Sequence, residues 1–311
     1  MAKLEKLEVI ETALDQYGWS IDLNAEGETV IESEVMYING PRETDYYHTC
    51  GLYHKAGVPF EITEVRHEDY EGLEPYLEYS KSFYEASKKA IKPGTGLLVA
   101  GGFCNFVTGI IGGLQQSMKK GKKIGVVYMD AHGDMETSDM SRSHIIAGCT
   151  VSAILGLDLD QWREISGITE PIQAENFILT DYHGRAYSDD YNIARAGLKI
   201  IDERGYNDSE LWTGRIKDLA DRVDAIVLHI DVDIMQSKYV PAFRFPLGPG
   251  GQTPEAVIRN VKDVMATGKV AVVSFMDVCF ESEREGHEIT YYNASRVLGN
   301  ILENWKEIPE L

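Results

Sequence analysis

Three side chains able to bind a metal follow one apolar run at every second position. The run covers residues 124–129, and Asp130, His132 and Asp134 come directly after it. In an extended chain, positions i, i+2 and i+4 point to the same side. We therefore expect these three side chains to converge on one point.

A second, largely apolar run ends in a similar way. Residues 225–230 are followed by Asp231 and Asp233, again two positions apart. Four carboxylates and an imidazole that face one crevice would repel each other unless a cation is bound, because buried charges need pairing or coordination. A lone D-x-D is often a solvated loop end or a helix cap. The two motifs together, each after a buried strand, indicate a metal site.

The donor atoms narrow the choice of metal. Oxygen and imidazole ligands favour Mn²⁺ or another borderline divalent ion over a structural zinc. Two such ions about 3.5–4 Å apart can bridge one water and activate it as a nucleophile. The expected cofactor is therefore two Mn²⁺ ions per chain.

Alternating strands and helices must position these residues. We predict eight strands, over residues 30–38, 60–66, 95–102, 123–130, 176–183, 198–203, 225–233 and 269–278. Segments of helical period, such as 73–91 and 253–268, lie between them. This alternation is typical of a three-layer α/β/α fold with a mainly parallel eight-stranded sheet, in which sites lie at the carboxyl ends of the strands. We expect residues 1–311 to form a single domain.

The composition limits the class of partner. Fifty acidic and 30 basic residues give a formal net charge of −20, so nucleic acid and anionic membranes are not expected partners. No apolar run is long enough for a transmembrane helix, and the N-terminus lacks the apolar core of a signal peptide. The four cysteines are irregularly spaced and predict no disulfide framework. We expect a cytoplasmic protein.

The motifs together resemble those of the arginase/agmatinase family of ureohydrolases. That family carries a Gly-Gly-Asp-His-Ser turn, a D-A-H-x-D strand end and a D-x-D strand end. The counterparts here are "GGFCN" (101–105), "DAHGD" (130–134) and "DVD" (231–233). The family's Pro-Gly-Gly-Leu-Thr helix start is similar to "PGGQTPEAV" (249–257), and its final strand resembles "VVSFMDV" (272–278).

The resemblance, which runs from about residue 95 to the C-terminal helix, implies an arginase-like domain with ligands for two ions. Asp130 and Asp231 would bridge both ions. Asp134 would complete one ion, and His132 with Asp233 would complete the other.

The remaining ligand of that family is a histidine, and this chain has Cys104 in its place. Three interpretations stay open. Cys104 is a thiolate ligand that shifts the site toward zinc, iron or another softer ion. Alternatively it is a weak or absent ligand, or it is a small buried hydrophobe in a site that has lost one metal. The side-chain amide of Asn105 is a reserve ligand.

Further departures from the family pattern bear on the substrate. The proton-shuttle histidine of arginases aligns with Ala147, and His144 would replace it in a shorter loop. Asp277 matches the glutamate that binds the guanidinium in arginases, with a side chain one methylene shorter. The positions that hold the amino-acid head group in arginases read Glu136, Ser143, Ile145 and His183. Only the serine is unchanged.

These substitutions make free arginine a poor candidate substrate. The formiminoglutamase branch of the family meets a substrate carboxylate with an arginine, where this chain has Met135 and Glu136. The resemblance therefore implies hydrolysis of a guanidino group to urea and an amine, on a cationic guanidino small molecule or an arginine-containing peptide. Asp134 would hold the nucleophilic water, Asp277 would hold the cation, and His144 would assist proton transfer.

Other functions stay open. Cys104 and Ala147, in place of two expected histidines, favour a non-catalytic regulatory or assembly protein, whereas five intact ligands favour an enzyme. A formiminoglutamase-like hydrolase is a further alternative. The deacetylase-like branch, which uses one zinc, is disfavoured by the bridging aspartates. The family usually forms trimers or hexamers, so we expect a homo-oligomer, and we expect Cys149 and Cys279 to be buried by packing.

Overall fold

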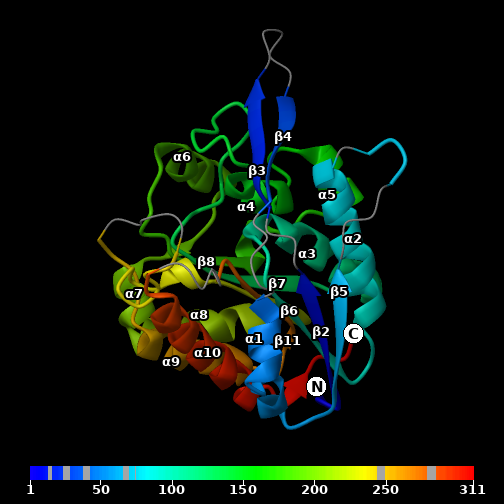
Figure 1. The fold of residues 1–311 in the computed structure, drawn as a ribbon, viewed down its shortest axis with the longest axis vertical. Helices are drawn as coiled ribbons and strands as arrows, with labels where there is room; N and C mark the ends of the chain where they lie inside the picture. The colour runs from blue at the N-terminus through cyan, green and yellow to red at the C-terminus, as the bar shows by residue number, and fades with distance from the viewer. Residues whose placement is uncertain are drawn as a thin grey trace.

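The computed structural model describes residues 1–12, 16–23, 29–37, 43–65, 70–73, 75–243, 249–278 and 285–311. Its centre is a parallel eight-stranded sheet with the strand order β5-β2-β6-β11-β10-β7-β8-β9 (Figure 1). The strands are β2 (Lys6–Thr12), β5 (Phe60–Val65), β6 (Thr95–Ala100), β7 (Ile124–Asp130), β8 (Phe177–Asp181), β9 (Ile200–Ile201), β10 (Ala225–Asp231) and β11 (Val270–Met276). The predicted α/β fold with an eight-stranded sheet is confirmed.

The strand predicted at 30–38 does not belong to this sheet, and that part of the prediction is wrong. It is β4 (Thr29–Tyr37), which pairs antiparallel with β3 (Gln16–Leu23) in a separate two-stranded sheet. A second small sheet joins β1 (Ala2–Lys3) to β12 (Glu307–Ile308) near the two ends of the described chain. An extended segment can be predicted from its pattern, but the pattern does not say which sheet it joins.

The eighth strand of the main sheet is β2, which the sequence analysis did not predict. Charged residues interrupt its apolar pattern, yet Glu8 and Glu11 are buried. Lys6 Nζ donates to Glu8 Oε1 at 2.8 Å, and the hydroxyl of Tyr53 donates to Glu11 Oε1 at 2.9 Å. These partners compensate the buried acidic side chains, so the acids can lie in a strand that is covered on both faces.

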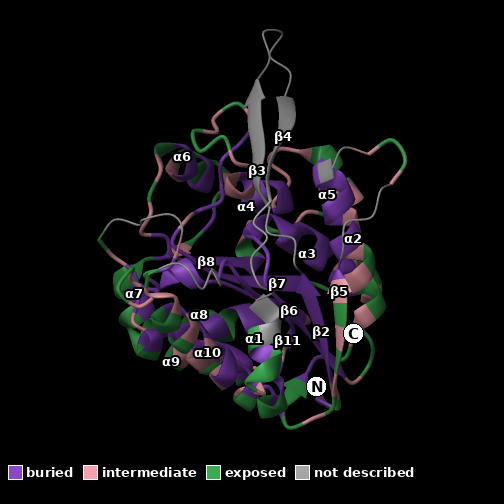
Figure 2. Ribbon diagram, viewed as in Figure 1, coloured by how far each residue is buried: buried purple, intermediate pink, exposed green. Residues whose placement is uncertain are grey.

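Helices cover both faces of the sheet, and alternate residues of each strand enter different cores. Leu98 and Leu228 face a core shared with α8, α9 and α10. Leu97 and Val227 face the opposite core, shared with α2, α3, α4 and α5. Successive side chains of a strand point to opposite faces, so the sheet is buried on both sides (Figure 2).

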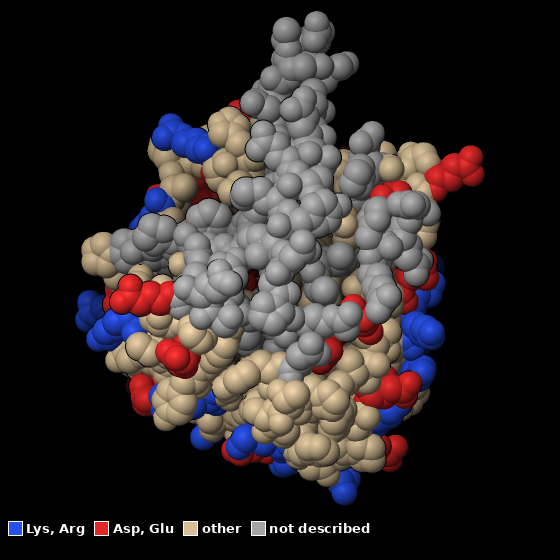
Figure 3. Space-filling view, in the orientation of Figure 1, with Lys and Arg blue, Asp and Glu red and all other residues tan. Residues whose placement is uncertain are grey.

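The helices of the described chain have the following bounds: α1 (Glu43–Thr49), α2 (Pro75–Ala90), α3 (Val107–Ser117), α4 (Thr150–Ile154), α5 (Asp160–Ile165), α6 (Tyr187–Ala196), α7 (Glu203–Asn207), α8 (Ser209–Arg222), α9 (Pro254–Met265) and α10 (His287–Asn304). Among these, none is both long enough and apolar enough to cross a membrane. On the face drawn in Figure 3, the described acidic and basic side chains are interspersed.

Candidate active site and metal centre

A two-glycine turn brings Cys104 to the carboxyl end of β6. Gly101 and Gly102 have φ angles of 89° and 86°, in a region of backbone conformation that residues other than glycine rarely adopt. The Gly101 N–H donates to the Phe275 carbonyl, and the Gly102 carbonyl accepts from the Asp277 N–H, both at 3.0 Å. The turn is therefore fixed to the end of β11, and it places Cys104 beside Asp277.

Three aspartates each use one carboxylate oxygen to hold the local backbone. Oδ1 of Asp130 accepts from the His132 N–H at 2.7 Å, and Oδ1 of Asp231 accepts from the Asp233 N–H at 2.8 Å. Oδ1 of Asp233 accepts from the Ala131 N–H at 3.0 Å. The second oxygen of each aspartate contacts another side chain of the cluster. The carboxylates are thus oriented before any ligand binds.

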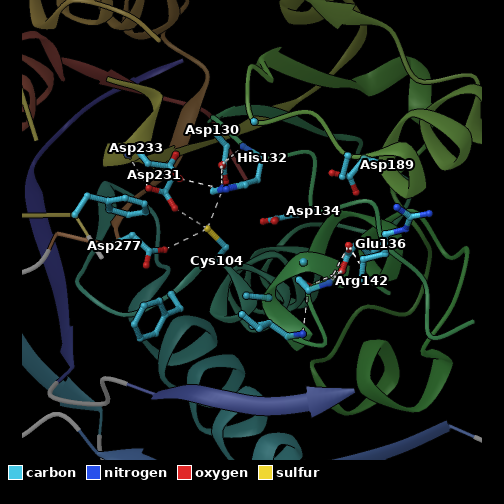
Figure 4. A pocket seen from close by; sticks show the side chains of 18 residues that line it. Cys104, Asp130, His132, Asp134, Glu136, Arg142, Asp189, Asp231, Asp233 and Asp277 are labelled. Carbon is cyan, nitrogen blue, oxygen red and sulfur yellow. Dashed lines mark hydrogen bonds and ion pairs between the residues drawn. The ribbon is translucent and has the colours of Figure 1, made fainter. Parts of the chain in front are cut away.

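Cys104 lies among the carboxylates (Figure 4). Its Sγ is 3.5 Å from Asp130 Oδ2, 3.2 Å from Asp231 Oδ2 and 3.4 Å from Asp277 Oδ2. The side chain is buried. Burial and the acids around it, Asp231 first among them, raise the pKa of the Cys104 thiol well above its ordinary value. A bound cation would reverse that effect, because metals bind the thiolate.

His132 joins the same cluster from the loop after β7. Its Nδ1 is 2.9 Å from Asp233 Oδ2 and 3.4 Å from Asp130 Oδ1. Burial lowers the pKa of His132, but the carboxylates of Asp233 and Asp130 outweigh burial and raise it to about 12. Without a metal, the protonated imidazole is therefore the cation that pairs with these acids.

The raised pKa values of the acids indicate that the cluster fits a cation. Burial, followed by repulsion from Asp233, raises the pKa of Asp130 to about 6. Burial, with Asp233 and Asp277 nearby, raises the pKa of Asp231 well above its ordinary range. Acids this close together and out of water do not all ionise unless positive charge is supplied. Oxygen, nitrogen and sulfur donors in this arrangement fit a divalent metal.

Asp134 lines the same cavity but is held differently. It has a φ of 48°, and its Oδ2 accepts from the hydroxyl of Tyr128 at 2.7 Å. Burial and the charge of Asp130 raise the pKa of Asp134 well above its ordinary value. The tightest groups of candidate ligand atoms among the described residues do not include it. Its predicted role as a ligand stays a prediction.

His229, which none of the sequence motifs identified, also lies within the cluster. Its Nε2 is 3.5 Å from Cys104 Sγ and 3.9 Å from Asp130 Oδ2. The ring is fully buried, and burial lowers the pKa of His229 to about 3, so the ring is neutral at neutral pH. A signal was present in the sequence. His229 precedes Asp231 by two positions on β10, so both side chains point to the same face.

These side chains line a cavity of about 370 Å³, a volume within the range of small-molecule sites. Apolar walls come from Phe103, Ile145, Ala147 and Phe243. Glu136, Arg142 and Asp189 also line it, on the side away from Asp277 (Figure 4). The cavity therefore has a cluster of candidate metal ligands at one side and a second, smaller set of charged groups at the other.

Glu136 and Ser143 contact each other at this second side. Ser143 Oγ donates to Glu136 Oε2 at 2.5 Å, and the hydroxyls of Ser141 and Ser188 donate to the same carboxylate at 2.9 Å and 3.3 Å. Glu136 is buried, whereas Ser143 is exposed. Glu136 holds the loop that follows it in place, and direct contact of either residue with substrate stays a prediction.

Asp189, in the first turn of α6, is a further acid that the sequence analysis missed. It accepts from the Met135 N–H at 3.0 Å. Burial and the charge of Glu136 raise the pKa of Asp189 to about 7. No spacing rule connects position 189 or Arg142 with the motifs, so only the folded chain shows that they share this cavity.

The structure does not bring the two remaining predicted histidines into the cavity. His144 is exposed with a φ of 53°, and its N–H donates to Ser141 Oγ at 3.1 Å. His183 follows β8, and its Nδ1 lies 3.3 Å from Asp181 Oδ2. Neither is among the described residues that line the cavity. The structure thus lends no support to His144 as a proton shuttle or to His183 as a substrate contact.

The two other cysteines named in the sequence analysis have different outcomes. Cys149 is buried, as expected. Cys279 lies outside the described residues.

Comparison with known proteins assigns the family. A sequence profile of the Arginase family matches residues 42–302. The chain belongs to the arginase family. The match begins well before residue 95, where the motif resemblance becomes strong, and it includes every candidate ligand of this arginase-family chain.

Individual relatives are distant. The arginase of Brevibacillus brevis is 26% identical over 195 residues, which are 61% of this chain and 63% of that protein. The arginase of Bacillus caldovelox is 26% identical over 180 residues, which are 56% of this chain and 58% of that protein. The alignments therefore span less than two thirds of the length of these relatives.

Solved structures of the family share the fold over nearly the whole chain. The Entamoeba histolytica arginase in complex with L-ornithine superposes with a TM-score of 0.79 at 17% identity, covering 97% of this chain and 99% of that one. The formimidoylglutamase of Bacillus subtilis gives a TM-score of 0.69 at 16% identity, covering 98% and 88%. At these identities the likeness establishes the fold.

Proposed function

We propose that this arginase-family protein is a metal-dependent hydrolase that cleaves a guanidino group to urea and an amine. The observation that carries the proposal is the convergence of Asp130, Asp231 and Asp233 in one cavity, each with one oxygen fixed by the backbone. Asp277 lies beside them and can hold a cationic substrate.

Two groups of side chains would hold the metals. Asp130, His132 and Asp233 form one candidate group. Cys104 with Asp231 lies next to it, in a group that also includes Asp277. Two divalent cations bound there, which we expect to include Mn²⁺, would supply the Lewis acidity that lowers the pKa of a water molecule. The anchored carboxylates would keep both positions open without rearrangement of the backbone.

Asp277 is suited to orient the guanidinium. Its side chain lines the cavity, and the residue is only 9% exposed. A carboxylate accepts parallel N–H donors from a guanidinium, so the pair has a defined direction as well as a charge. This contact would hold the central carbon of the substrate toward Asp130 and Asp231.

Asp134 is suited to move the proton. The Tyr128 hydroxyl donates to its Oδ2, so Oδ1 is the oxygen that would carry the transferred proton. A carboxylate in this place can take a proton from the attacking water and pass it to the leaving amine. With His144 outside the cavity lining, Asp134 is the described group best placed for both transfers.

The second side of the cavity bears on the substrate. Glu136 and Asp189 favour a cationic or neutral tail, as in a guanidino amine, a modified arginine or arginine within a peptide. Arg142 lines the same side and could instead meet a carboxylate. The position of Arg142 favours a formimino-glutamate derivative as a second candidate, hydrolysed at a C–N bond as well.

Metal content and product release test the proposal together. Metal per chain is measured first, then urea release from free arginine, agmatine, N-hydroxyarginine and arginine-containing peptides, and formamide release from formimino-glutamate. We expect two ions per chain and urea from a member other than free arginine. Formamide alone would identify the second candidate. Empty sites after manganese loading, with no product from any compound, would favour a regulatory or assembly protein.

Two ligand variants test the site itself. Asp130→Ala and Asp231→Ala should each remove metal and turnover, because each deletes a buried donor of the cluster. Asp224→Ala is the matched control, because Asp224 does not line the cavity and its carboxylate accepts a hydrogen bond from Lys122 Nζ. Full turnover in either ligand variant would contradict the assignment.

A further inference from the structure

We propose that His229 and Cys104 are joint ligands of one metal position, and that this position takes Zn²⁺ in preference to Mn²⁺. The neighbouring position of Asp130, His132 and Asp233 has no sulfur and would discriminate less strongly against Mn²⁺. The inference rests on the proposed function only in assigning metals to this cavity. The two metal positions then differ in their donor atoms, because only one of them contains a thiolate.

The donor atoms have the spacing of a small metal site. Cys104 Sγ is 3.5 Å from both His229 Nε2 and Asp130 Oδ2, and these two atoms are 3.9 Å apart. The point equidistant from all three lies about 2.1 Å from each. This is close to zinc bonds to nitrogen and oxygen, of roughly 2.0–2.2 Å, and slightly shorter than zinc bonds to sulfur, of roughly 2.3 Å. Asp231 Oδ2 lies 3.2 Å from Cys104 Sγ, but it belongs to a separate group of candidate ligand atoms, with Cys104 and Asp277.

The imidazole is held as a metal-binding histidine usually is. His229 pairs in register with Ser274 on the neighbouring strand β11, and its Nδ1 lies 2.8 Å from Ser274 Oγ. With the ring proton on Nδ1, the lone pair of Nε2 faces Cys104. The ring also packs against Tyr128, with ring centroids 4.1 Å apart. Both contacts fix the direction of Nε2.

The two residues complement each other. The family pattern places an imidazole at position 104, and this chain has a thiol there, while His229 brings an imidazole to the same place from β10. A thiolate with an imidazole is a softer donor set than carboxylates with an imidazole, and softer sets favour zinc over manganese. Each metal position then has one histidine, but only one position has sulfur.

Co²⁺ binding distinguishes the two metal positions, because only a thiolate ligand produces charge-transfer absorption. Metal-free protein is titrated with Co²⁺, and thiolate-to-cobalt charge-transfer absorption is recorded together with the number of ions bound. We expect two ions in the wild type, of which one produces the absorption. Cys104→Ser should abolish it. His229→Ala should weaken that ion at least tenfold and leave the other in place.

His132→Ala is the matched control, because it removes the imidazole of the other position. It should lose the other ion and keep the charge-transfer absorption. Ser274→Ala leaves the His229 ring in place and should weaken the same ion by about 10–100-fold. This variant decides the question if His229→Ala does not fold, as judged by circular dichroism.

The outcomes distinguish the inference from the proposed function. Two bound ions in the wild type, with unchanged affinity and spectrum in His229→Ala or in Ser274→Ala, would overturn the role of His229 alone. No ion bound to the wild type would overturn the metal site altogether. In competition between Zn²⁺ and Mn²⁺, a preference of this position for zinc that falls by about tenfold or more in Cys104→Ser would support the assignment, and an unchanged preference would overturn it.

Discussion

Three aspartates near the cavity adopt a backbone conformation that is costly for most residues. Asp134, Asp181 and Asp277 have φ angles of 48°, 63° and 62°. Aspartate tolerates the left-handed region better than larger side chains, and backbone strain of this kind often marks a functional site. At the scale of single residues, this conformation lets Asp277 turn from the end of β11 toward Cys104.

Asp277→Asn tests whether this residue binds substrate or metal. The substitution keeps the shape and removes the charge that would pair with a guanidinium. We expect unchanged metal content and a kcat/KM lower by about 10²–10³-fold, measured by steady-state kinetics and metal analysis of the same preparation. Asp277→Glu should retain more activity. Loss of a metal ion from Asp277→Asn would instead make this residue a ligand.

At the scale of elements, the turn after β6 has little room for a side chain. A Cβ on Gly102 would lie 2.5 Å from a ring carbon of Phe106 and 3.2 Å from Thr12 Cγ2. The Phe106 ring stacks on Phe83 with centroids 4.2 Å apart, so it cannot easily move aside. The position of Cys104 therefore depends on glycine at 102.

Gly102→Ala and Gly121→Ala form a matched pair. Both glycines have a φ of 86°, but a Cβ on Gly121 meets nothing within 4 Å. We expect Gly121→Ala to lower the free energy of unfolding by about 1–2 kcal/mol through its backbone conformation. Gly102→Ala should cost about 1–3 kcal/mol more through overpacking, and it should reduce metal binding. Equal denaturation midpoints for the two variants would contradict this account.

The elements were largely predictable because their apolar runs are long. Seven of the eight predicted strands lie in the main sheet. The exceptions have physical causes. In β2, the partners of Glu8 and Glu11 come from other positions of the sequence, so burial of these acids could not be predicted. The pattern of 30–38 indicates an extended chain, but its pairing with β3 depends on the folded structure.

At the scale of the whole molecule, metal binding and stability are linked through the acids. The pKa of Asp130 in the folded, metal-free chain is about 6, above its ordinary value of 3.8. Its contribution to stability is therefore complete below pH 3.8 and is lost as the pH rises through 6. A cation removes that loss, because it binds the ionised carboxylate.

Melting temperatures at two pH values test this linkage. Mn²⁺ should raise the Tm of metal-free protein more at pH 8 than at pH 5, where protons compete with the metal. At a metal concentration one hundred times Kd, the stabilisation is about 2.7 kcal/mol. Asp130→Asn should remove most of the difference, and Asp224→Asn should not. An equal or larger shift at pH 5 would be inconsistent with the raised pKa.

The residue types and their spacing predicted only those site residues that are close in sequence, and Cys104 and Asp277 were predicted from the family resemblance. Five candidate ligands fall in short motifs, so their types and spacing pointed to metal binding before the fold was known. His229 was hidden within a buried strand, where a histidine has no obvious role. Asp189 and Arg142 line the same cavity as the motif residues because α6 and the loop before α4 pack against it. Their proximity is a property of the complete fold.

The strand order has a consequence for motion. Cys104, Asp130, Asp231 and Asp277 come from the ends of β6, β7, β10 and β11, which are four neighbours in the middle of the sheet. Local opening starts where strands have fewest partners, here β5 and β9 at the rim. Amide hydrogens of the rim can therefore exchange with solvent while the four ligand-bearing strands stay closed. The slowest-exchanging amides of the protein should lie directly beneath the proposed metal positions.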